Sequence, residues 1–119
     1  MSNYKQVIVL RKFPNLRTGK YVAQGAHASQ LAIKHCQEIK PEYYEEYMKD
    51  HIRKIVIYVN TEQELRDLWV QAYNEQLPVS IVEDAGFTEF HGVKTVTAIA
   101  IGPCPSELID PITKDLPLF

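Results

Sequence analysis

Four runs of apolar residues along the chain have the length and composition of β-strands. The first extends from Tyr4 to Leu10 and holds four consecutive aliphatic residues at positions 7–10. The others are Arg53 to Val59, Val79 to Val82 and Thr95 to Ile101. Because unbroken aliphatic runs are typical of strands covered on both faces, we expect the first two to be buried strands of one sheet.

Helical patterns separate these strands. The segment from about Gly19 to His35 is expected to be a helix rich in small residues, with Thr18 as a candidate cap for its first turn. Thr61 and Glu64 form a capping box, and it is followed by apolar residues at helical spacing through about residue 75. Small residues in the first helix would let its backbone approach the sheet closely.

Shorter elements complete the pattern. The stretch from Pro41 to Met48 predicts a short exposed helix that presents its tyrosines on one side. Residues 102–105, Gly-Pro-Cys-Pro, are expected to end the fourth strand, and Ser106 to cap a last helix that reaches Ile109. The apolar-ended tail from Pro111 to Phe119 is expected to pack against the body.

The order strand, helix, strand, helix, strand predicts an α/β fold with a parallel sheet, because crossover connections are right-handed and place helices over the sheet. The short segment 85–94 favours a hairpin that returns the fourth strand antiparallel to the third. We therefore expect a four-stranded mixed sheet with three strands parallel and the last antiparallel. Residues 1–119 are expected to form one domain.

Composition narrows the class of protein. Of the 119 residues, 45% are hydrophobic and 24% charged, which is ordinary for a globular protein. The first ten residues hold too short an apolar run for a signal peptide or a membrane span, so a cytoplasmic protein with no membrane partner is expected. Cys36 and Cys104 lack metal-type spacing and are expected to be reduced packing residues.

Charge is distributed unevenly along the chain. Residues 1–40 carry a net charge of +6 and the remaining residues −8, which gives the overall −2. Such asymmetry favours an anionic partner on the basic side, although folding can scatter these charges.

The first helix carries the most informative polar pattern. Lys20, Gln24 and His27 stand at i, i+4 and i+7 and so share a face. The helix start, with Arg17 beside Lys20, offers free N–H groups and a positive dipole end to a phosphate or another anion. The alternative is a solvated lysine on a helix whose small residues only pack.

Ligands of open α/β sheets bind at the carboxyl ends of parallel strands, where residues 17–20, Asn60-Thr61 and Asp84 are expected to converge. Asp84 has two interpretations: it orients or deprotonates a water, or it caps the turn at Ala85-Gly86. Thr88 and Thr97 are likewise either strand residues or hydrogen-bond donors to a ligand.

Several chemistries are disfavoured. Pro14 and Tyr21 stand where a P-loop requires Gly and Ser or Thr, and the four histidines lack zinc-ligand spacing. Ser29 is not on a nucleophile elbow, and Cys36 lies near a helix C-terminus, where the dipole disfavours a thiolate. A noncovalent site remains, suited to attack by water on an activated ester or amide. No metal or organic cofactor is expected.

Three blocks of sequence resemble the type 2 peptidyl-tRNA hydrolases, in order and at appropriate spacing from about Tyr4 to the end. They are Arg17-Thr18-Gly19-Lys20 followed by Ala23-Gln24 and Ala26-His27-Ala28, Asp84-Ala85-Gly86 with Thr88-Glu89, and Thr97 to Pro103. The chain departs from the family's pattern at Gly25, often a cysteine, at Phe87, usually a basic residue, and in the turn at residues 91–94.

The resemblance implies a hydrolase that cleaves the ester between a peptide and the 3′ end of tRNA, on a three-layer α/β/α sandwich. By position, Lys20, Asp84 and Thr88 match the family's functional residues. Gln24, His27 and Thr97 match supporting positions. Arg17 is expected to contact tRNA, and Phe87 to offer a stacking face in place of a charge.

Other interpretations stay open at this stage. A noncatalytic RNA-binding or adaptor domain would keep the fold, and a small-molecule binder would use the helix start for an anion. The joint presence of Lys20 and Asp84 favours the enzyme, since an adaptor has no evident need for both. A homodimer is also left open.

Overall fold

The computed structural model describes residues 3–86, 90 and 92–119. The elements of these residues follow in chain order as β1 (Tyr4–Arg11), α1 (Thr18–Ile39), α2 (Pro41–Lys49), β2 (Lys54–Val59), α3 (Glu62–Asn74), β3 (Val79–Asp84), β4 (Thr95–Pro105) and α4 (Ser106–Thr113). The predicted alternation of strands and helices is confirmed, with most boundaries moved by a few residues.

The strands form one mixed sheet in the order β2-β1-β4-β3. β1 and β2 pair in parallel, whereas β4 lies between β1 and β3 and pairs antiparallel with both. The predicted hairpin from β3 to β4 is confirmed. β4 lies between β1 and β3, so these two strands do not pair with each other. The sheet therefore has fewer parallel pairs of neighbouring strands than the sequence predicted.

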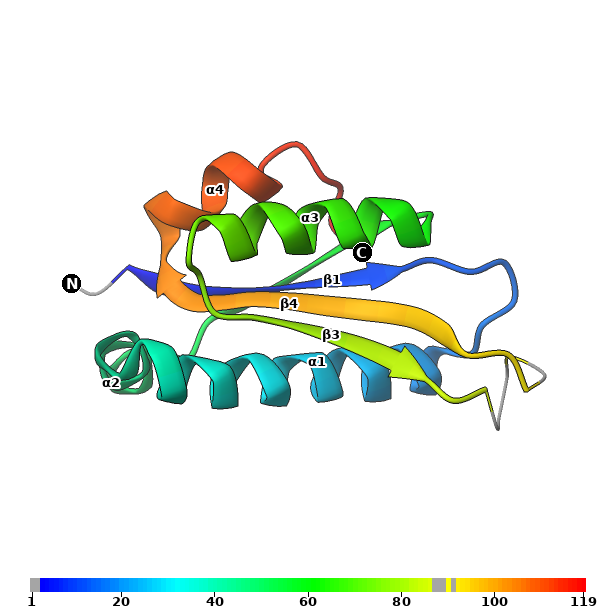
Figure 1. Ribbon diagram of the computed structural model, residues 1–119, viewed down its shortest axis with the longest axis horizontal. Helices are drawn as coiled ribbons and strands as arrows, with labels where there is room; N and C mark the ends of the chain where they lie inside the picture. Colours follow the sequence, from blue (N-terminus) through cyan, green and yellow to red (C-terminus); the bar gives the residue numbers. More distant parts are fainter. Residues whose placement is uncertain (1–2, 87–89, 91) are drawn as a thin grey trace.

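Helices cover both faces of the sheet: α1 and α2 lie on one side, and α3 and α4 on the other (Figure 1). The consecutive residues Val7 to Leu10 alternate between these sides. Val7 and Val9 join the core under α3 and α4, and Ile8 and Leu10 join the core under α1. β1 is thus buried on both faces, as its unbroken aliphatic run predicted.

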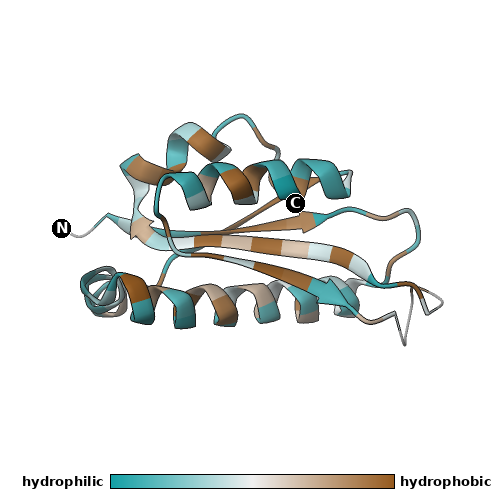
Figure 2. Ribbon diagram, viewed as in Figure 1, coloured by the Kyte–Doolittle hydropathy of each residue, from teal (hydrophilic) through white to brown (hydrophobic). Residues whose placement is uncertain are grey.

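Small residues bring α1 close to the sheet. Ala28 and Ala32 of α1 are fully buried and pack in the same cluster as Ala98 and Ala100 of β4. Hydrophobic residues are frequent along the strands, whereas hydrophilic and hydrophobic residues alternate along the helices, as expected for helices with one face on the sheet (Figure 2). The expected close approach of this helix is confirmed at its alanines.

β2 differs from the expectation of a strand buried on both faces. It is an edge strand, and its burial alternates: Ile57 and Val59 are buried while Lys54 and Val56 are exposed. α1 lies over the middle of the sheet and leaves this face of β2 uncovered. The aliphatic run alone did not distinguish an edge strand from a central one.

β4 continues past its predicted end to Pro105. Gly102 has a φ of +96°, and a Cβ there would lie 2.6 Å from the carbonyl oxygen of Lys5. The pairing with β1 shifts register between Lys5 and Val7 and then resumes. The glycine therefore shapes an irregular stretch of strand and does not terminate it, so the prediction of a stop here is wrong.

Three helix details also differ from expectation. Thr18 is the first residue of α1, whose N-cap is Arg17 without a side-chain cap. Tyr47 of α2 is fully buried and donates to the carbonyl oxygen of Arg53, so this helix is less exposed than predicted. α4 begins at Ser106 but runs through Pro111 to Thr113.

Other local predictions are confirmed. The Thr61 hydroxyl accepts a hydrogen bond from the N–H of Glu64 at 3.2 Å, as the capping box requires. The tail packs on β2, where the N–H of Phe119 donates to the carbonyl oxygen of Val56 at 3.0 Å. Among the described residues, no helix is long and apolar enough to cross a membrane.

Candidate active site

The carboxylate of Asp84, at the end of β3, accepts hydrogen bonds from two side chains in the first turns of α1. Lys20 and Gln24 lie one helical turn apart and face the same way. The Nζ of Lys20 donates to Oδ2 of Asp84 at 2.7 Å, and the Nε2 of Gln24 donates to the same oxygen at 3.4 Å. Residues 60 and more positions apart in sequence thus meet at one oxygen atom.

The second oxygen of Asp84 holds the turn that follows. The N–H of Gly86 donates to Oδ1 at 2.7 Å. Gly86 has a φ of +86°, and a Cβ there would lie 2.5 Å from the carbonyl oxygen of Val93. The interpretation of Asp84 as the cap of this turn is therefore confirmed, and the turn fixes the carboxylate that Lys20 contacts. Its role in orienting or deprotonating a water stays a prediction.

The pair is partly shielded from water, since the side chains of Lys20 and Asp84 are 15% and 13% exposed. The hydrogen bond from Lys20 lowers the pKa of Asp84, burial opposes this, and the hydrogen bond from Gly86 lowers it further. Asp84 is consequently an ionised carboxylate at neutral pH. It keeps some contact with solvent, which allows a substrate or a water to reach it.

Thr97, on the sheet, fixes the orientation of the Gln24 amide. Thr97 lies on β4, is buried, and donates to Oε1 of Gln24 at 2.7 Å. Because the amide oxygen is occupied by this hydroxyl, the amide NH₂ is directed towards Asp84. Thr97, predicted as a site residue, supports the site from beneath Gln24.

The other predicted residues lie outside this hydrogen-bonded group or outside the described part of the chain. Arg17 and His27 are exposed on α1. Asn60-Thr61 follows β2, at the opposite edge of the sheet from β3, so its predicted convergence with Asp84 is wrong. Phe87 and Thr88 lie outside the described residues. Within the described part of the chain, the hydrogen-bond partners of the Asp84 carboxylate are Lys20, Gln24 and Gly86.

The sequence reading missed two phenylalanines beside the pair. The rings of Phe13 and Phe90 lie 5.0 Å apart between centroids, and the Nζ of Lys20 lies 5.8 Å from the Phe90 centroid. The guanidinium carbon of Arg11 lies 4.6 Å from the Phe13 centroid. The available signal was an aromatic residue next to two cations, Arg11 and Lys12, directly after a buried strand.

The cysteines do not supply a nucleophile. Both are fully buried, and burial raises the pKa of Cys36 to about 11 and that of Cys104 to about 12. Neither thiol forms an appreciable thiolate at neutral pH. The described residues contain no group of three or more His, Cys, Asp or Glu side chains placed to hold a metal ion.

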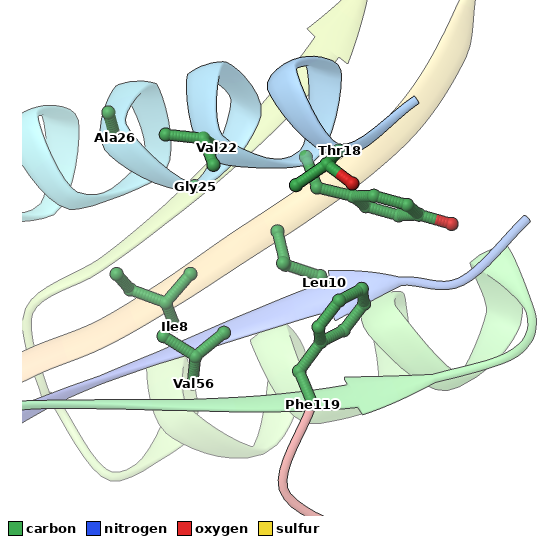
Figure 3. Close-up of a pocket in the computed structure, with 9 residues that line it drawn as sticks. Ile8, Leu10, Thr18, Val22, Gly25, Ala26, Val56 and Phe119 are labelled. Atoms are coloured by element: carbon green, nitrogen blue, oxygen red, sulfur yellow. The ribbon is translucent and has the colours of Figure 1, made fainter. Parts of the chain in front are cut away.

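A separate apolar groove of about 380 Å³ lies between α1 and the strands β1 and β2, beside the face of β2 that α1 leaves uncovered. Val22 and Ala26 of α1 face Ile8, Val56 and Phe119 across it (Figure 3). Lys20, Gln24 and Asp84 do not line this groove. Helix α1 therefore separates a polar cluster on one side from an apolar hollow on the other.

The sequence matches those of known proteins along nearly its whole length. The sequence model of the family described as peptidyl-tRNA hydrolase PTH2 matches residues 4–119. The chain is 41% identical to the peptidyl-tRNA hydrolase of Methanocaldococcus jannaschii, over 97% of this chain and 99% of that protein. It is 37% identical to the peptidyl-tRNA hydrolase of Thermococcus onnurineus, over 99% of each.

Proposed function

Because the chain belongs to the PTH2 family of peptidyl-tRNA hydrolases, we propose that Lys20 and Asp84 form the centre at which it cleaves peptidyl-tRNA. The activity is that of a carboxylic ester hydrolase, which releases free tRNA from the peptide joined to its 3′ end. The observation that carries the assignment of the centre is the 2.7 Å contact between Lys20 Nζ and Asp84 Oδ2 at the end of β3.

Asp84 binds and orients the attacking water. Lys20 and Gln24 use both lone-pair directions of Oδ2, whereas Gly86 uses one of the two on Oδ1, so Oδ1 keeps a direction that accepts an O–H of the water. A carboxylate with a lowered pKa is a weak base, so it takes the proton as the new C–O bond forms. Such general-base assistance contributes about 10²- to 10⁴-fold in rate.

Lys20 stabilises the negative charge that develops on the ester. The ammonium group has three N–H donors, and one of them reaches the carbonyl oxygen in the transition state. One such donor contributes about 10²- to 10³-fold. The ribose oxygen then leaves with the proton taken from water, and the peptide leaves as a carboxylic acid. No covalent bond to the protein forms.

The supporting residues complete this proposal. Thr88 provides a hydroxyl to the ester or the leaving oxygen, and Gln24 and Thr97 hold the carboxylate in place. Arg17 and His27, exposed on α1, contact the tRNA, and Phe87 stacks on a base. No metal or organic cofactor takes part.

We also propose a finer architecture for this protein. The protein is a single domain, a three-layer α/β/α sandwich with three strands in one direction and β4 opposed to them. Helices on both sides of the sheet and the antiparallel pairing of β4 support this (Figure 1). We also propose that it acts in the cytoplasm, and a homodimer is the assembly to test first.

The alternatives drawn from the sequence are not favoured. A noncatalytic adaptor or an anion binder gains nothing from a carboxylate held in ionised form by Lys20, Gln24 and Gly86. A bound anion would also be repelled by Asp84 beside the same lysine. Family membership over nearly the full length favours the enzyme as well.

The decisive experiment follows release of free tRNA from peptidyl-tRNA by purified protein. Asp84→Asn keeps the size of the side chain and removes its charge, so we expect at least a 10²-fold loss of kcat with the fold intact. Glu83→Gln makes the same chemical change at the exposed neighbour and is expected to leave kcat unchanged. Turnover near wild type by folded Asp84→Asn would eliminate Asp84 as the base.

A further inference from the structure

Phe13 and Phe90 form an aromatic pair that neither core of the protein requires. Phe13 lies in the loop between β1 and α1, and Phe90 lies in the turn between β3 and β4. Their rings are partly exposed, 5.0 Å apart between centroids and tilted by 51°. Among the described residues, neither belongs to the two hydrophobic clusters beneath the helices. Two large apolar rings are thus gathered at the surface.

The backbone of Phe13 is held in place by the side chain of Tyr21. The Tyr21 hydroxyl accepts from the N–H of Phe13 at 2.8 Å and donates to the carbonyl oxygen of Phe13 at 3.0 Å. Tyr21 follows Lys20 directly on α1. The loop that carries the first ring is therefore fixed to α1, the helix that also carries Lys20, which preorganises the pair for binding.

Cations flank the two rings. The Arg11 guanidinium lies over Phe13 at 4.6 Å from the centroid, and the Lys20 ammonium lies 5.8 Å from the centroid of Phe90. Lys20 in turn contacts Asp84 at 2.7 Å. Aromatic faces interleaved with positive charge are the combination that binds single-stranded nucleic acid, because bases stack and phosphates pair with the cations.

We propose that Phe13 and Phe90 bind the adenine of the 3′-terminal nucleotide of peptidyl-tRNA by stacking. This inference rests on the proposed function, which places the ester at Lys20 and Asp84. The ester oxygen belongs to the terminal ribose, so the adenine of the same nucleotide lies one sugar away, where Phe90 adjoins Lys20.

The chemistry of the substrate favours adenine over the amino acid side chain as the occupant. The terminal adenine is the same in every tRNA, whereas the side chain next to the ester changes from one peptide to another. Arg11, whose guanidinium lies over Phe13 and also contacts Glu62 at 3.6 Å, complements the phosphate that precedes the terminal nucleotide, whereas most amino acid side chains carry no negative charge for it.

A double-mutant cycle between ring and base tests this directly. The probes are an RNA minihelix that ends in CCA and the same minihelix with an abasic terminal nucleotide. Wild-type protein is expected to bind the first about 5- to 150-fold more tightly than the second, the range for one base stacked on an aromatic ring. Phe13→Leu keeps an apolar side chain without an aromatic face, and it is expected to reduce this ratio to below about threefold.

Tyr73→Leu supplies the matched control. Tyr73 lies on α3, is 57% exposed and stacks on Trp69 at 4.9 Å, away from Lys20 and Asp84. Its replacement is expected to leave the ratio at the wild-type value. Phe90→Leu provides a second variant and is expected to reduce the ratio as Phe13→Leu does, which keeps the test decisive if either variant folds poorly.

The outcomes separate this inference from the function on which it rests. A ratio that stays at the wild-type value in folded Phe13→Leu and Phe90→Leu would overturn adenine stacking. A fall of the same size in Tyr73→Leu would overturn it too, because the effect would not be local. Failure of the wild-type protein to release tRNA from peptidyl-tRNA would instead contradict the proposed function.

Discussion

Two buried glutamines connect α1 to the sheet, and only one of them reaches a charged group. Gln6 of β1 is fully buried, and its Nε2 donates to the carbonyl oxygens of Ser29 and Gly102 at 3.1 and 3.2 Å. Its Oε1 accepts from the Ser29 hydroxyl at 2.6 Å. Every strong donor and acceptor of this amide is used within the protein, so the network is closed.

Gln24 of α1 repeats the arrangement at the other end of the helix–sheet contact. A hydroxyl, that of Thr97, donates to its amide oxygen at 2.7 Å. Its amide nitrogen, however, donates to the Asp84 carboxylate at 3.4 Å, and Asp84 also contacts Lys20. This network ends on a partly exposed ion pair and so leaves hydrogen-bonding capacity for a substrate.

The comparison separates a polar group that holds the fold from one that orients a reactive group. A closed network contributes to the free energy of unfolding, because each partner would otherwise be buried without a hydrogen bond. An open network that ends on a carboxylate contributes to catalysis through the position and pKa of that carboxylate. Substitutions at the two ends should therefore affect different measurements.

The largest effect is expected from Lys20→Met, which removes the charge at the open end. We expect kcat to fall about 10²- to 10³-fold, since the donor to the developing oxyanion is lost. Lys20 is also the main cause of the lowered pKa of Asp84, so that pKa should rise in the variant. Activity requires ionised Asp84 and is lost as pH falls through its pKa, so the residual activity should disappear at higher pH than in wild type.

The pH profile of kcat/KM measures this shift. Lys34→Met, at an exposed position of the same helix, serves as the control and should keep the wild-type profile. An unchanged acid limb in Lys20→Met would show that Asp84 does not govern the profile.

Intermediate effects are expected from Gln6→Leu and Gln24→Leu. The first should mainly change the free energy of unfolding, and the second should mainly change kcat. Gln6→Leu should lower the free energy of unfolding by about 1–3 kcal/mol, because the Ser29 hydroxyl and two carbonyl groups lose their partner. Its kcat should stay near wild type. Gln24→Leu should lower kcat about tenfold, the value of one hydrogen bond to a charged group. Its loss of stability, about 1 kcal/mol for the single buried hydroxyl of Thr97 left without its acceptor, should be smaller than that of Gln6→Leu.

Urea denaturation and single-turnover hydrolysis of peptidyl-tRNA measure the two quantities on the same samples. The distinction between closed and open networks fails if both variants lose stability and activity in the same proportion.

The smallest effect is expected at two glycines near these networks. A Cβ at Gly25 would lie 3.6 Å from Ile8 and Leu10, an ordinary contact, so Gly25→Ala should stabilise α1 by up to about 1 kcal/mol without a change in kcat. Gly102→Ala should destabilise, because its φ is +96° and a Cβ would lie 2.6 Å from the carbonyl oxygen of Lys5. Thermal unfolding of both variants compares them, and loss of stability in Gly25→Ala would show that α1 needs the glycine for close approach.

Local patterns identified much of the fold and part of the site. The aliphatic run of β1 and the capping box of α3 are properties of neighbouring residues, so they could be read directly. Lys20 and Gln24 were paired correctly because they are one helical turn apart. Asp84 followed from its place at the end of a strand, before a glycine whose turn it holds.

Other features depend on which segments become neighbours. The exposure of Val56 follows from the edge position of β2, which its aliphatic sequence does not reveal. The displacement of Asn60-Thr61 from Asp84 has the same cause, since β1 and β4 lie between their strands. Gln6 carried no sequence signal at all, because its partners are 23 and 96 residues away.

The sequence by itself determined the alternating α/β elements, the family and the helical pairing of Lys20 with Gln24, because these rest on periodicity and on motifs within short segments. Only the tertiary structure decided that β4 inserts between β1 and β3, and that Asp84 shares one oxygen between Lys20 and Gln24. The same holds for Phe13 and Phe90, which meet beside that pair from two separate loops. The physical reason is that strand order and side-chain contacts across the sheet are set by packing between distant segments, and local propensity does not encode them.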